Sequence, residues 1–398
     1  MLVGHSWYFF VLIVALIIYW RLENCLQPRL AFTAITGFLA LAFLLSRAMS
    51  PAFACGLLLV LLFCAIATYR IAMKLAKARS NVWFWLGLVI PFFALVSIYL
   101  GTKLAAEHSL RWLVPISVGF FALRAAHFIY ESYRGGIKPQ DFLSFVAYLL
   151  FFPTMIAGPL ERFPKFIEQL SVPFSIDHLM VGAERILIGS FKKFILADIL
   201  MLALLPPQSL SVTGFDHSSW ATILFACVMR CLYVYFDFAG YSDMAIGTGR
   251  LFGFKLVENF DYPLLRSNLA EFWRAWHRSL SSFARDYVYF PLLAKYRSVG
   301  LASIFSMIAV ALWHGVSPGW LLWGMHHGIG LTVLARFNRF APRYRRLQAM
   351  RHTLVWRIAA LLFTWFYVAL GFSFTWSPEN FDTCIKIYST LLTFGILR

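Results

Sequence analysis

The chain has 398 residues, of which 61% are hydrophobic and 13% are charged, and its mean hydropathy is +0.72. Soluble domains carry about a quarter charged residues. This composition therefore excludes a soluble globular protein, and the apolar content also excludes a disordered chain. The net charge of +17 does not indicate a nucleic-acid partner, because the Lys and Arg residues lie in short segments between apolar runs, where they set topology. We predict a polytopic membrane protein whose partner is the lipid bilayer.

Apolar runs recur along the whole chain. A helix needs about 20 residues to cross the hydrocarbon core. The runs that approach this length are Tyr8–Trp20, Leu30–Leu45, Ala52–Tyr69, Val82–Leu100, Trp112–Tyr130, Phe142–Leu160, Ile186–Leu205, Trp220–Phe238, Leu301–Trp313, Trp320–Ala335, Val355–Trp376 and Phe381–Leu397. They predict an all-α fold of about 10–12 transmembrane or re-entrant helices. The first run has no Lys or Arg before it, so we expect it to stay as an anchor rather than to be cleaved as a signal peptide.

Two basic segments predict the orientation. Tyr69–Arg79 and Arg336–Arg351 carry Lys and Arg but no acidic residue, so both are expected on the cytoplasmic side. Counting back from the first of them places the N-terminus outside. The expected location is the cell (inner) membrane, with several passes.

Ionisable residues distinguish the middle of the chain. After about residue 115 the apolar stretches contain Arg124, His127, Glu131, Lys192, Lys193, Asp198, Asp237, Asp243, His277 and His314. Each such group at membrane depth is expensive unless it is paired or hydrated, so we expect a polar, watered interior there. The chain is predicted to form one membrane domain, 1–398, with peripheral helices at 1–114, a functional core at 115–335, and a basic loop and C-terminal helices at 336–398.

The densest polar cluster is Phe236–Asp243 (FDFAGYSD). Its small residues permit close approach of helices, and the carboxylates of Asp237 and Asp243 need donors at membrane depth. We favour a packed helix junction with two buried, hydrogen-bonded carboxylates. Use of these carboxylates as catalytic acid and base groups is the alternative.

A second cluster begins at Asn268. With Glu271 three residues later, Asn268 predicts a helix start of the capping-box kind. On a continuous helix, Trp273, Trp276 and His277 would share one face. His277 is therefore a candidate functional residue, although aromatic and basic residues at a membrane interface explain most of the pattern.

Arginines accompany this histidine. Arg274 and Arg278 would lie one turn apart on the same helix, with Arg285 further along. Arginine binds phosphates bidentately, as a coenzyme A tail would require. The two cations beside His277 should also disfavour its protonated form.

His314 ends the next clear apolar run. A Gly-Val-Ser-Pro-Gly stretch follows it, so the helix is predicted to break just past the histidine. Neutral imidazole is relatively cheap to bury and takes a proton near pH 7, which makes His314 a candidate general base. His326 and His327 are weaker candidates, for which packing or a hydrogen bond to a carbonyl is the favoured role.

Other catalytic arrangements are not indicated. The sequence has no GxSxG or HExxH motif and no cysteine with a nearby histidine. The six cysteines are scattered and form no CxxC pair, so structural thiols and no metal site are expected.

Together these motifs resemble the membrane-bound O-acyltransferase (MBOAT) family, in its bacterial polysaccharide-modifying branch. The segments that carry the resemblance are Phe152–Pro159 with Arg162, Asp237–Arg250, Glu258–Phe260, Phe272–Ser281, Arg285–Tyr287, Leu312–Gly315 and Leu322–Gly324. Within the branch, the sequence is similar first to members that O-acetylate alginate and next to those that transfer D-alanyl groups to teichoic acid. It departs from the alginate type at Leu293–Val299, where a Gly-Gly-Asn-Arg stretch is usual, so the resemblance does not extend to alginate as the polymer.

The resemblance implies an all-helical fold with a central tunnel. His314 falls on the position of the family's invariant histidine, and His277 on the second motif histidine of the branch. The implied reaction moves an acetyl group from a cytoplasmic thioester through the membrane to a hydroxyl. His314 would act as general base, His277 would hydrogen-bond the reacting groups, and the three arginines would attract the donor's phosphates.

The same resemblance implies the partners. Acetyl-CoA is the expected donor, an acyl carrier protein is the alternative, and no permanently bound cofactor is expected. The acceptor route involves an extracytoplasmic acyltransferase partner and a polysaccharide. D-alanyl transfer is the runner-up reaction. A transporter, which the buried ionisable groups alone would allow, and a scaffold that leaves catalysis to its partner are the alternatives of another class.

Overall fold

The computed structural model describes residues 6–48, 50–105, 113–137, 141–155, 158–205 and 218–394, and no strand occurs within these ranges. The chain divides into two compact units. The first comprises Met1–Ile188 and Ser242–Val257, and the second comprises Gly189–Tyr241 and Glu258–Arg398. The predicted limits near residues 114 and 335 stay predictions. Trp112, Ile156 and Ala157, and the end of the predicted run Phe381–Leu397 lie outside the described residues.

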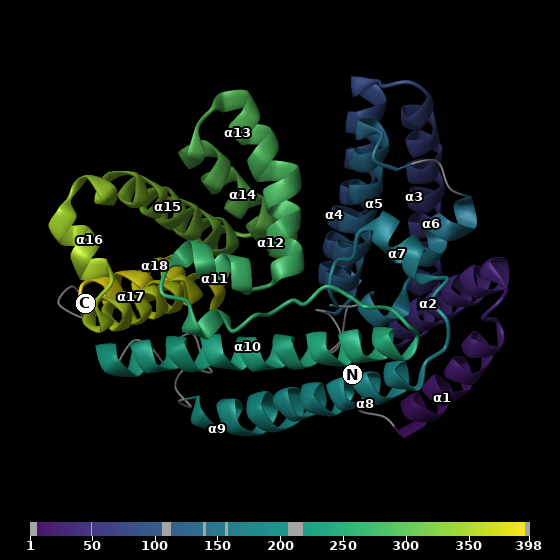
Figure 1. Ribbon diagram of the computed structural model, residues 1–398, viewed down its shortest axis with the longest axis horizontal. Coiled ribbons are helices and arrows are strands. Elements are labelled where there is room, and N and C mark those ends of the chain that lie inside the picture. The colour runs from purple at the N-terminus through teal and green to yellow at the C-terminus, as the bar shows by residue number, and fades with distance from the viewer. Residues whose placement is uncertain are drawn as a thin grey trace. The chain divides into compact units, whose positions relative to one another are not determined.

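Long apolar helices form the first unit. The helices that begin in it are α1 (Ser6–Arg21), α2 (Leu26–Ala48), α3 (Pro51–Lys77), α4 (Asn81–Ala105), α5 (Leu113–Arg134), α6 (Phe142–Leu149), η2 (Phe152–Thr154), α7 (Phe163–Gln169) and α8 (Ile176–Ser190). Short connections place α3, α4 and α5 side by side, as Figure 1 shows. The predicted runs up to residue 130 therefore correspond to helices, with ends that differ by several residues.

The predicted run Phe142–Leu160 is wrong as a single helix. α6 ends at Leu149, and the short η2 turn with Pro153 follows. The Arg124 guanidinium compensates for this break. It donates to the carbonyls of Tyr148 (3.2 Å) and Leu149 (2.9 Å), and to the carbonyl (3.0 Å) and hydroxyl of Thr154. One buried arginine thus satisfies carbonyls that a longer helix would have paired.

Helices also make up the second unit. Those that begin in it are η3 (Phe191–Met201), α9 (Leu202–Leu204), α10 (Trp220–Leu251), η6 (Pro263–Leu265), α11 (Leu269–Ala275), α12 (Arg278–Ala284), η7 (Arg285–Tyr289), α13 (Phe290–Tyr296), α14 (Val299–His314), α15 (Pro318–Phe340), η8 (Ala341–Arg343), α16 (Arg345–Arg351), α17 (Leu354–Phe372), η9 (Ser373–Thr375) and α18 (Phe381–Leu392). α14 and α15 pack closely as a helical hairpin (Figure 1). Side chains of α10, α17 and α18 form a core cluster that includes Cys227, Ala369 and Leu391.

The motif Phe236–Asp243 lies in the interior of α10 rather than at a helix end. α10 includes Gly240 and its neighbours and continues to Leu251, well beyond the end of the predicted run at Phe238. The expected close approach is nevertheless present. A Cβ built on Gly240 would lie 2.6 Å from the backbone nitrogen of Lys193 and 2.7 Å from the carbonyl oxygen of Gly189.

Replacing Gly240 with alanine is expected to destabilise the protein by about 1–3 kcal/mol, since the added methyl would push the backbones of α10 and η3 apart. Gly56→Ala in α3 is the matched control, because a Cβ there meets nothing within 4 Å. That variant is expected to be neutral or stabilised by up to about 1 kcal/mol. Thermal unfolding of both variants in one detergent measures the difference. Equal melting temperatures would contradict the close approach.

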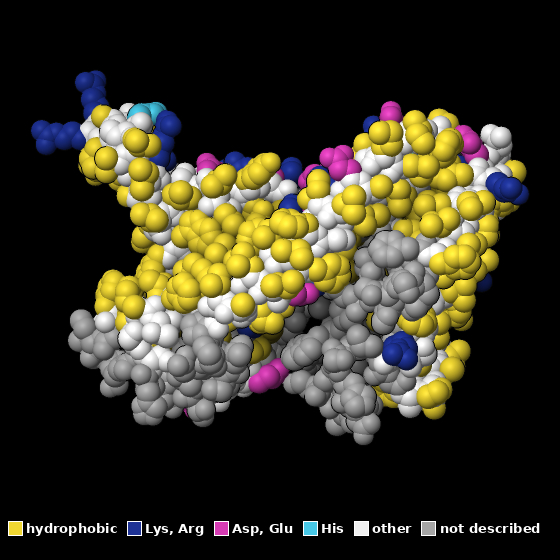
Figure 2. Space-filling model, turned by 90° about the horizontal axis from the view of Figure 1, so that it is seen from below, with side chains coloured by type: hydrophobic (Ala, Val, Ile, Leu, Met, Phe, Trp, Pro, Cys, Tyr) yellow, Lys and Arg dark blue, Asp and Glu magenta, His cyan; other side chains and the backbone are white. Residues whose placement is uncertain are grey.

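Apolar surface confirms the membrane class. Within the described part of the chain, four helical segments are long and apolar enough to cross a bilayer: Leu26–Arg47, Pro51–Lys77, Trp220–Leu251 and Leu354–Thr375. Other apolar helices, such as Val299–His314, are shorter. Hydrophobic side chains cover much of the face shown in Figure 2, and its Lys and Arg side chains lie mostly along the edges. The predicted all-α membrane fold, with some elements too short to span on their own, is confirmed.

Candidate functional site

His277 lies on a sharp turn between two short helices. Asn268 caps α11 by accepting a hydrogen bond from the Glu271 amide (2.9 Å), so the predicted helix start is confirmed. The helix ends at Ala275, Trp276 is extended, and His277 adopts a left-handed conformation with φ of 42° before α12 begins. Such a backbone is strained for a residue with a side chain, and strain of this kind clusters at functional sites.

Asn259, which belongs to neither of the two short helices, forms hydrogen bonds with this turn. Its carbonyl accepts a hydrogen bond from the Arg278 amide (2.8 Å), and its side-chain oxygen accepts one from the Ser279 hydroxyl (2.6 Å). Asn259 is fully buried. The start of α12 is therefore anchored to the Glu258–Phe260 motif, which explains why the helix cannot continue through His277.

The prediction of one continuous helix through Arg274 and Arg278 is therefore wrong. Arg274 belongs to α11 and Arg278 begins α12, so the two guanidinium groups do not pair as neighbours on one helix face. Arg274 is exposed and Arg278 is half-buried. Arg285 is exposed and donates to the carboxylate of Asp286 (2.9 Å). A phosphate at Arg285 would have to compete with this carboxylate.

His277 itself is buried, with 3% of the residue's surface exposed, and neither ring nitrogen has a hydrogen-bond partner. Its ring contacts Phe238 of α10 (centroids 4.6 Å apart) and Trp313 of α14 (5.9 Å). A buried imidazole with two free nitrogens is costly unless a ligand supplies the missing bonds. This orphaned ring is the clearest sign of a binding site in the second unit.

Burial holds the pKa of His277 well below its usual range, and the neighbouring His314 lowers it further. The turn that carries His277 lies outside the four candidate spans. The expectation that protonation is disfavoured is confirmed in direction. Its physical cause is desolvation first and His314 second, instead of the adjacent arginines.

His314 is the last residue of α14, and Gly315 follows in extended backbone, so the predicted helix break is confirmed. His314 is exposed as a residue, but desolvation by the surrounding protein atoms lowers the pKa of its imidazole to about 4. Tryptophans surround its ring: Trp313 at 4.7 Å, Trp320 at 4.6 Å and Trp323 at 5.8 Å between centroids. Trp313 thus contacts both histidine rings and brings the two candidates together.

His326 and His327 lie further along α15, beyond Trp323. The ring of His326 is hydrogen-bonded to the Tyr367 carbonyl (3.0 Å), as the favoured packing role predicted. His327 is buried, and its ring contacts Trp323 (4.9 Å) and Trp273 (5.1 Å). These histidines continue the aromatic cluster away from His314.

Three of the carboxylates in and near the apolar stretches are paired with Lys193 or Arg185. Lys193 Nζ donates to Asp198 (2.6 Å) and to Asp237, and Arg185 donates to Asp243 (2.9 Å). The Asp243 carboxylate is buried, whereas about a third of the Asp237 side-chain surface is exposed (32%). The expected donors are therefore present, but only one of the two carboxylates is buried.

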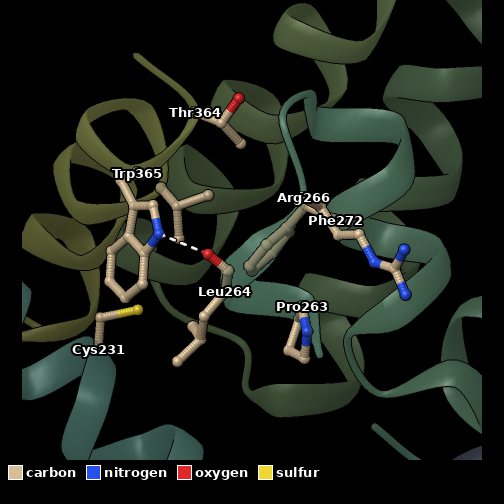
Figure 3. Close-up of a pocket in the computed structure, with 8 residues that line it drawn as sticks. Cys231, Pro263, Leu264, Arg266, Phe272, Thr364 and Trp365 are labelled. Atoms are coloured by element: carbon tan, nitrogen blue, oxygen red, sulfur yellow. Dashed lines mark hydrogen bonds between the residues drawn. The ribbon is translucent and has the colours of Figure 1, made fainter. Parts of the chain in front are cut away.

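A small pocket lies between α11 and α17 (Figure 3). Its lining residues are Cys231, Pro263, Leu264, Arg266, Phe272, Thr364, Trp365 and Val368. The indole of Trp365 donates to the Leu264 carbonyl (2.7 Å), which ties α17 to η6. The predicted site residues are not part of this lining.

The strained backbone at His277 leads to a stability prediction. His277→Gly and His277→Ala both remove the ring, but only glycine adopts a positive φ without steric cost. The glycine variant is expected to be more stable than the alanine variant by about 1 kcal/mol. Thermal unfolding of the purified variants measures the difference. An alanine variant of equal or greater stability would show that the turn relaxes.

Fold and site together define a helical membrane protein with a histidine pair in an aromatic setting. The model of the membrane-bound O-acyltransferase family matches residues 120–376. This segment is more than half of the chain and includes both histidines. The chain belongs to the membrane-bound O-acyltransferase family, which confirms the resemblance drawn from the motifs.

Relatives of several activities are similar to the chain. The probable alginate O-acetylase AlgI of Azotobacter vinelandii is 32% identical over 292 residues, covering 71% of this chain and 54% of the relative. The peptidoglycan O-acetyltransferase of Helicobacter pylori is 26% identical over 374 residues, which cover 81% of this chain and 67% of the relative. The teichoic acid D-alanyltransferase of Streptococcus thermophilus is 32% identical over 273 residues, which cover 64% of this chain and 65% of the relative. The chain spans about half the length of the alginate relative.

The aromatic cluster around His314 was not predicted from the sequence. Trp320 and Trp323 lie in the first turns of α15, which folds back along α14. The available signal was the pair of tryptophans directly after the predicted break. From the sequence, Asn259 is only a member of the Glu258–Phe260 motif. Its two hydrogen bonds to the first residues of α12 are evident only in three dimensions.

Proposed function

We propose that this protein is an O-acyltransferase that moves an acetyl group from a cytoplasmic thioester to a hydroxyl, for O-acetylation of an extracytoplasmic polysaccharide. The observation that carries the proposal is the histidine pair on either side of Trp313, within the segment that matches the family model. One histidine is exposed and the other is buried with both nitrogens unpaired.

His314 is the general base in this proposal, because it is the exposed member of the pair. A ring nitrogen takes the proton of the acceptor hydroxyl while the oxygen attacks the thioester carbonyl carbon. The carbon–sulfur bond then breaks, and His314 donates the proton that it took from the hydroxyl to the departing thiolate. A neutral base of this kind contributes about 10²–10⁴ in rate.

His277 has the supporting role. Its unpaired nitrogens are placed to hydrogen-bond the reacting groups, and its low pKa keeps the ring neutral. Arg274, Arg278 and Arg285 attract the phosphates of the donor, acetyl-CoA, from the cytoplasmic side. Exclusion of bulk water while donor and acceptor are bound would limit hydrolysis of the thioester.

The proposed setting is the inner cell membrane, crossed several times. The acetyl group passes through a tunnel in the fold to a hydroxyl of an extracytoplasmic acyltransferase partner, which carries it to the polysaccharide. The names of the alginate and peptidoglycan relatives support a polysaccharide as the final acceptor.

Transfer of D-alanyl groups from an acyl carrier protein to teichoic acid is the second candidate. The teichoic acid D-alanyltransferase relatives favour it, because their identity to this chain is similar to that of the alginate relative. Exposed arginines suit either donor, since phosphopantetheine and the surface of an acidic carrier are also anionic.

A donor test separates these candidates. Membranes that contain the protein, its acceptor and its partner are supplied with acetyl-labelled CoA or with a labelled D-alanyl carrier protein. Label on the acceptor from acetyl-CoA is the expected result. Label from the carrier alone would establish the second candidate. Substrate flux without thioester consumption would indicate a transporter, and donor use only by the partner would indicate a scaffold.

A further inference from the structure

The contact between His314 and Trp320 differs from the other ring contacts of the proposed base. The two ring planes are nearly parallel, at 11°, with centroids 4.6 Å apart. Trp313 and Trp323 instead meet His314 at 67° and 80°, as edge contacts. In the described part of the chain, no carboxylate or carbonyl hydrogen-bonds the His314 ring. The indole face of Trp320 therefore defines the plane of this imidazole.

The backbone is shaped to permit this stack. α14 ends at His314, and α15 begins at Pro318, so Trp320 lies in the first turn of the returning helix. A Cβ built on Gly315 would lie 2.9 Å from Cδ1 and 3.1 Å from Nε1 of Trp320. The missing side chain at Gly315 leaves the space that the indole occupies beside His314.

A histidine base becomes a cation when it takes a proton. Many histidine bases are oriented and stabilised in that state by a buried carboxylate. Among the described residues, the titratable groups that the ring contacts place next to the His314 cluster are two histidines: His277 across Trp313, and His327 behind Trp323. Neither offers a negative charge. The Trp320 indole that stacks on His314 presents a ring face that attracts a cation, and tryptophan is the strongest of the aromatic side chains in this respect.

We propose that Trp320 is a positioning residue for the transfer reaction: its indole holds the His314 ring in plane and stabilises the imidazolium that forms when His314 takes the hydroxyl proton. This inference rests on the proposed role of His314 as general base. It assigns to an aromatic face the task that a carboxylate performs in other histidine-dependent sites. The proton itself follows the route already described, from the hydroxyl to His314 and then to the departing thiolate.

The test compares wild type with Trp320→Phe and Trp320→Leu. Phenylalanine keeps an aromatic face with weaker attraction for a cation, and leucine removes the face. Exchange of the imidazole C2 proton for deuterium, followed by mass spectrometry over a pH series, gives the titration midpoint of each histidine without requiring activity. The His314 midpoint is expected to fall in the order Trp, Phe, Leu, by about half a pH unit in total. The exposed His352 is the internal control, and its midpoint should not move.

Acetyl transfer provides the second readout. The acid limb of the pH–rate profile is expected to shift to lower pH in the same order, and kcat is expected to fall while KM for acetyl-CoA stays constant. Gly315→Ala keeps the indole but displaces it, so the His314 midpoint should fall in this variant too. This variant, together with Trp320→Phe, keeps the test valid if Trp320→Leu does not fold.

Two failures remain distinguishable. An unchanged His314 midpoint and an unmoved acid limb in Trp320→Leu would overturn the inference and reduce Trp320 to a packing residue, even if transfer declines. Full transfer by His314→Ala would overturn the proposed function instead, whatever the exchange data show for the stack.

Discussion

Replacing His314 with alanine is expected to lower acetyl transfer about 10²–10⁴-fold, because the hydroxyl would lose the base that takes its proton. The loss should appear in kcat. The measurement is transfer of labelled acetyl groups in membranes with matched amounts of wild type and variant. Little change in stability is expected, since His314 is exposed as a residue and closes a helix that Gly315 ends in any case.

His352→Ala is the matched control for this prediction. His352 is also exposed and lies directly after a helix, at the end of α16, but it is not part of the histidine and tryptophan cluster. Transfer by this control should equal that of the wild type. Undiminished transfer by His314→Ala at normal expression would leave the family assignment in place and remove the mechanism.

The largest stability effect is expected at Arg124. Arg124→Met should lower the free energy of unfolding by about 3–5 kcal/mol, because the carbonyls of Tyr148, Leu149 and Thr154 would remain buried without their donor. Methionine keeps most of the side-chain volume, so the loss would report hydrogen bonding more than packing. Unfolding in mixed detergent micelles is the measurement.

Arg134→Met serves as the control on the same helix. Arg134 also belongs to α5 but is exposed, so its replacement should change stability by about 0.5 kcal/mol or less. Similar stability of the two methionine variants would contradict the view that Arg124 holds the break after α6.

Several features of the fold were predictable from local sequence. The run Ala52–Tyr69 lies within α3, and Asn268 caps α11, because apolar length and capping chemistry act between residues close in the chain. The helix break after His314 was also predictable, since glycine and proline act on their own backbone. Membership of the family followed from motifs in their order.

The break of the helix at His277 was not predictable in this way. Trp276 and His277 carry no strong breaking signal of their own. The turn forms because Asn259, distant in sequence, hydrogen-bonds to the first residues of α12. The prediction of one helix over Phe142–Leu160 was wrong for a related reason. Arg124, on another helix, donates hydrogen bonds to the carbonyls that the break after α6 leaves without helical partners.

By itself, the sequence determined that this protein is a helical membrane protein of the O-acyltransferase family, and it indicated His314 and His277. These properties depend on composition, run length and motifs, which are local. Only the tertiary structure decided that both histidines contact Trp313, that His277 is buried with unpaired nitrogens, and that Trp320 stacks on His314. Such contacts depend on how separate helices pack, and packing geometry is set by many weak non-local interactions that no short segment encodes.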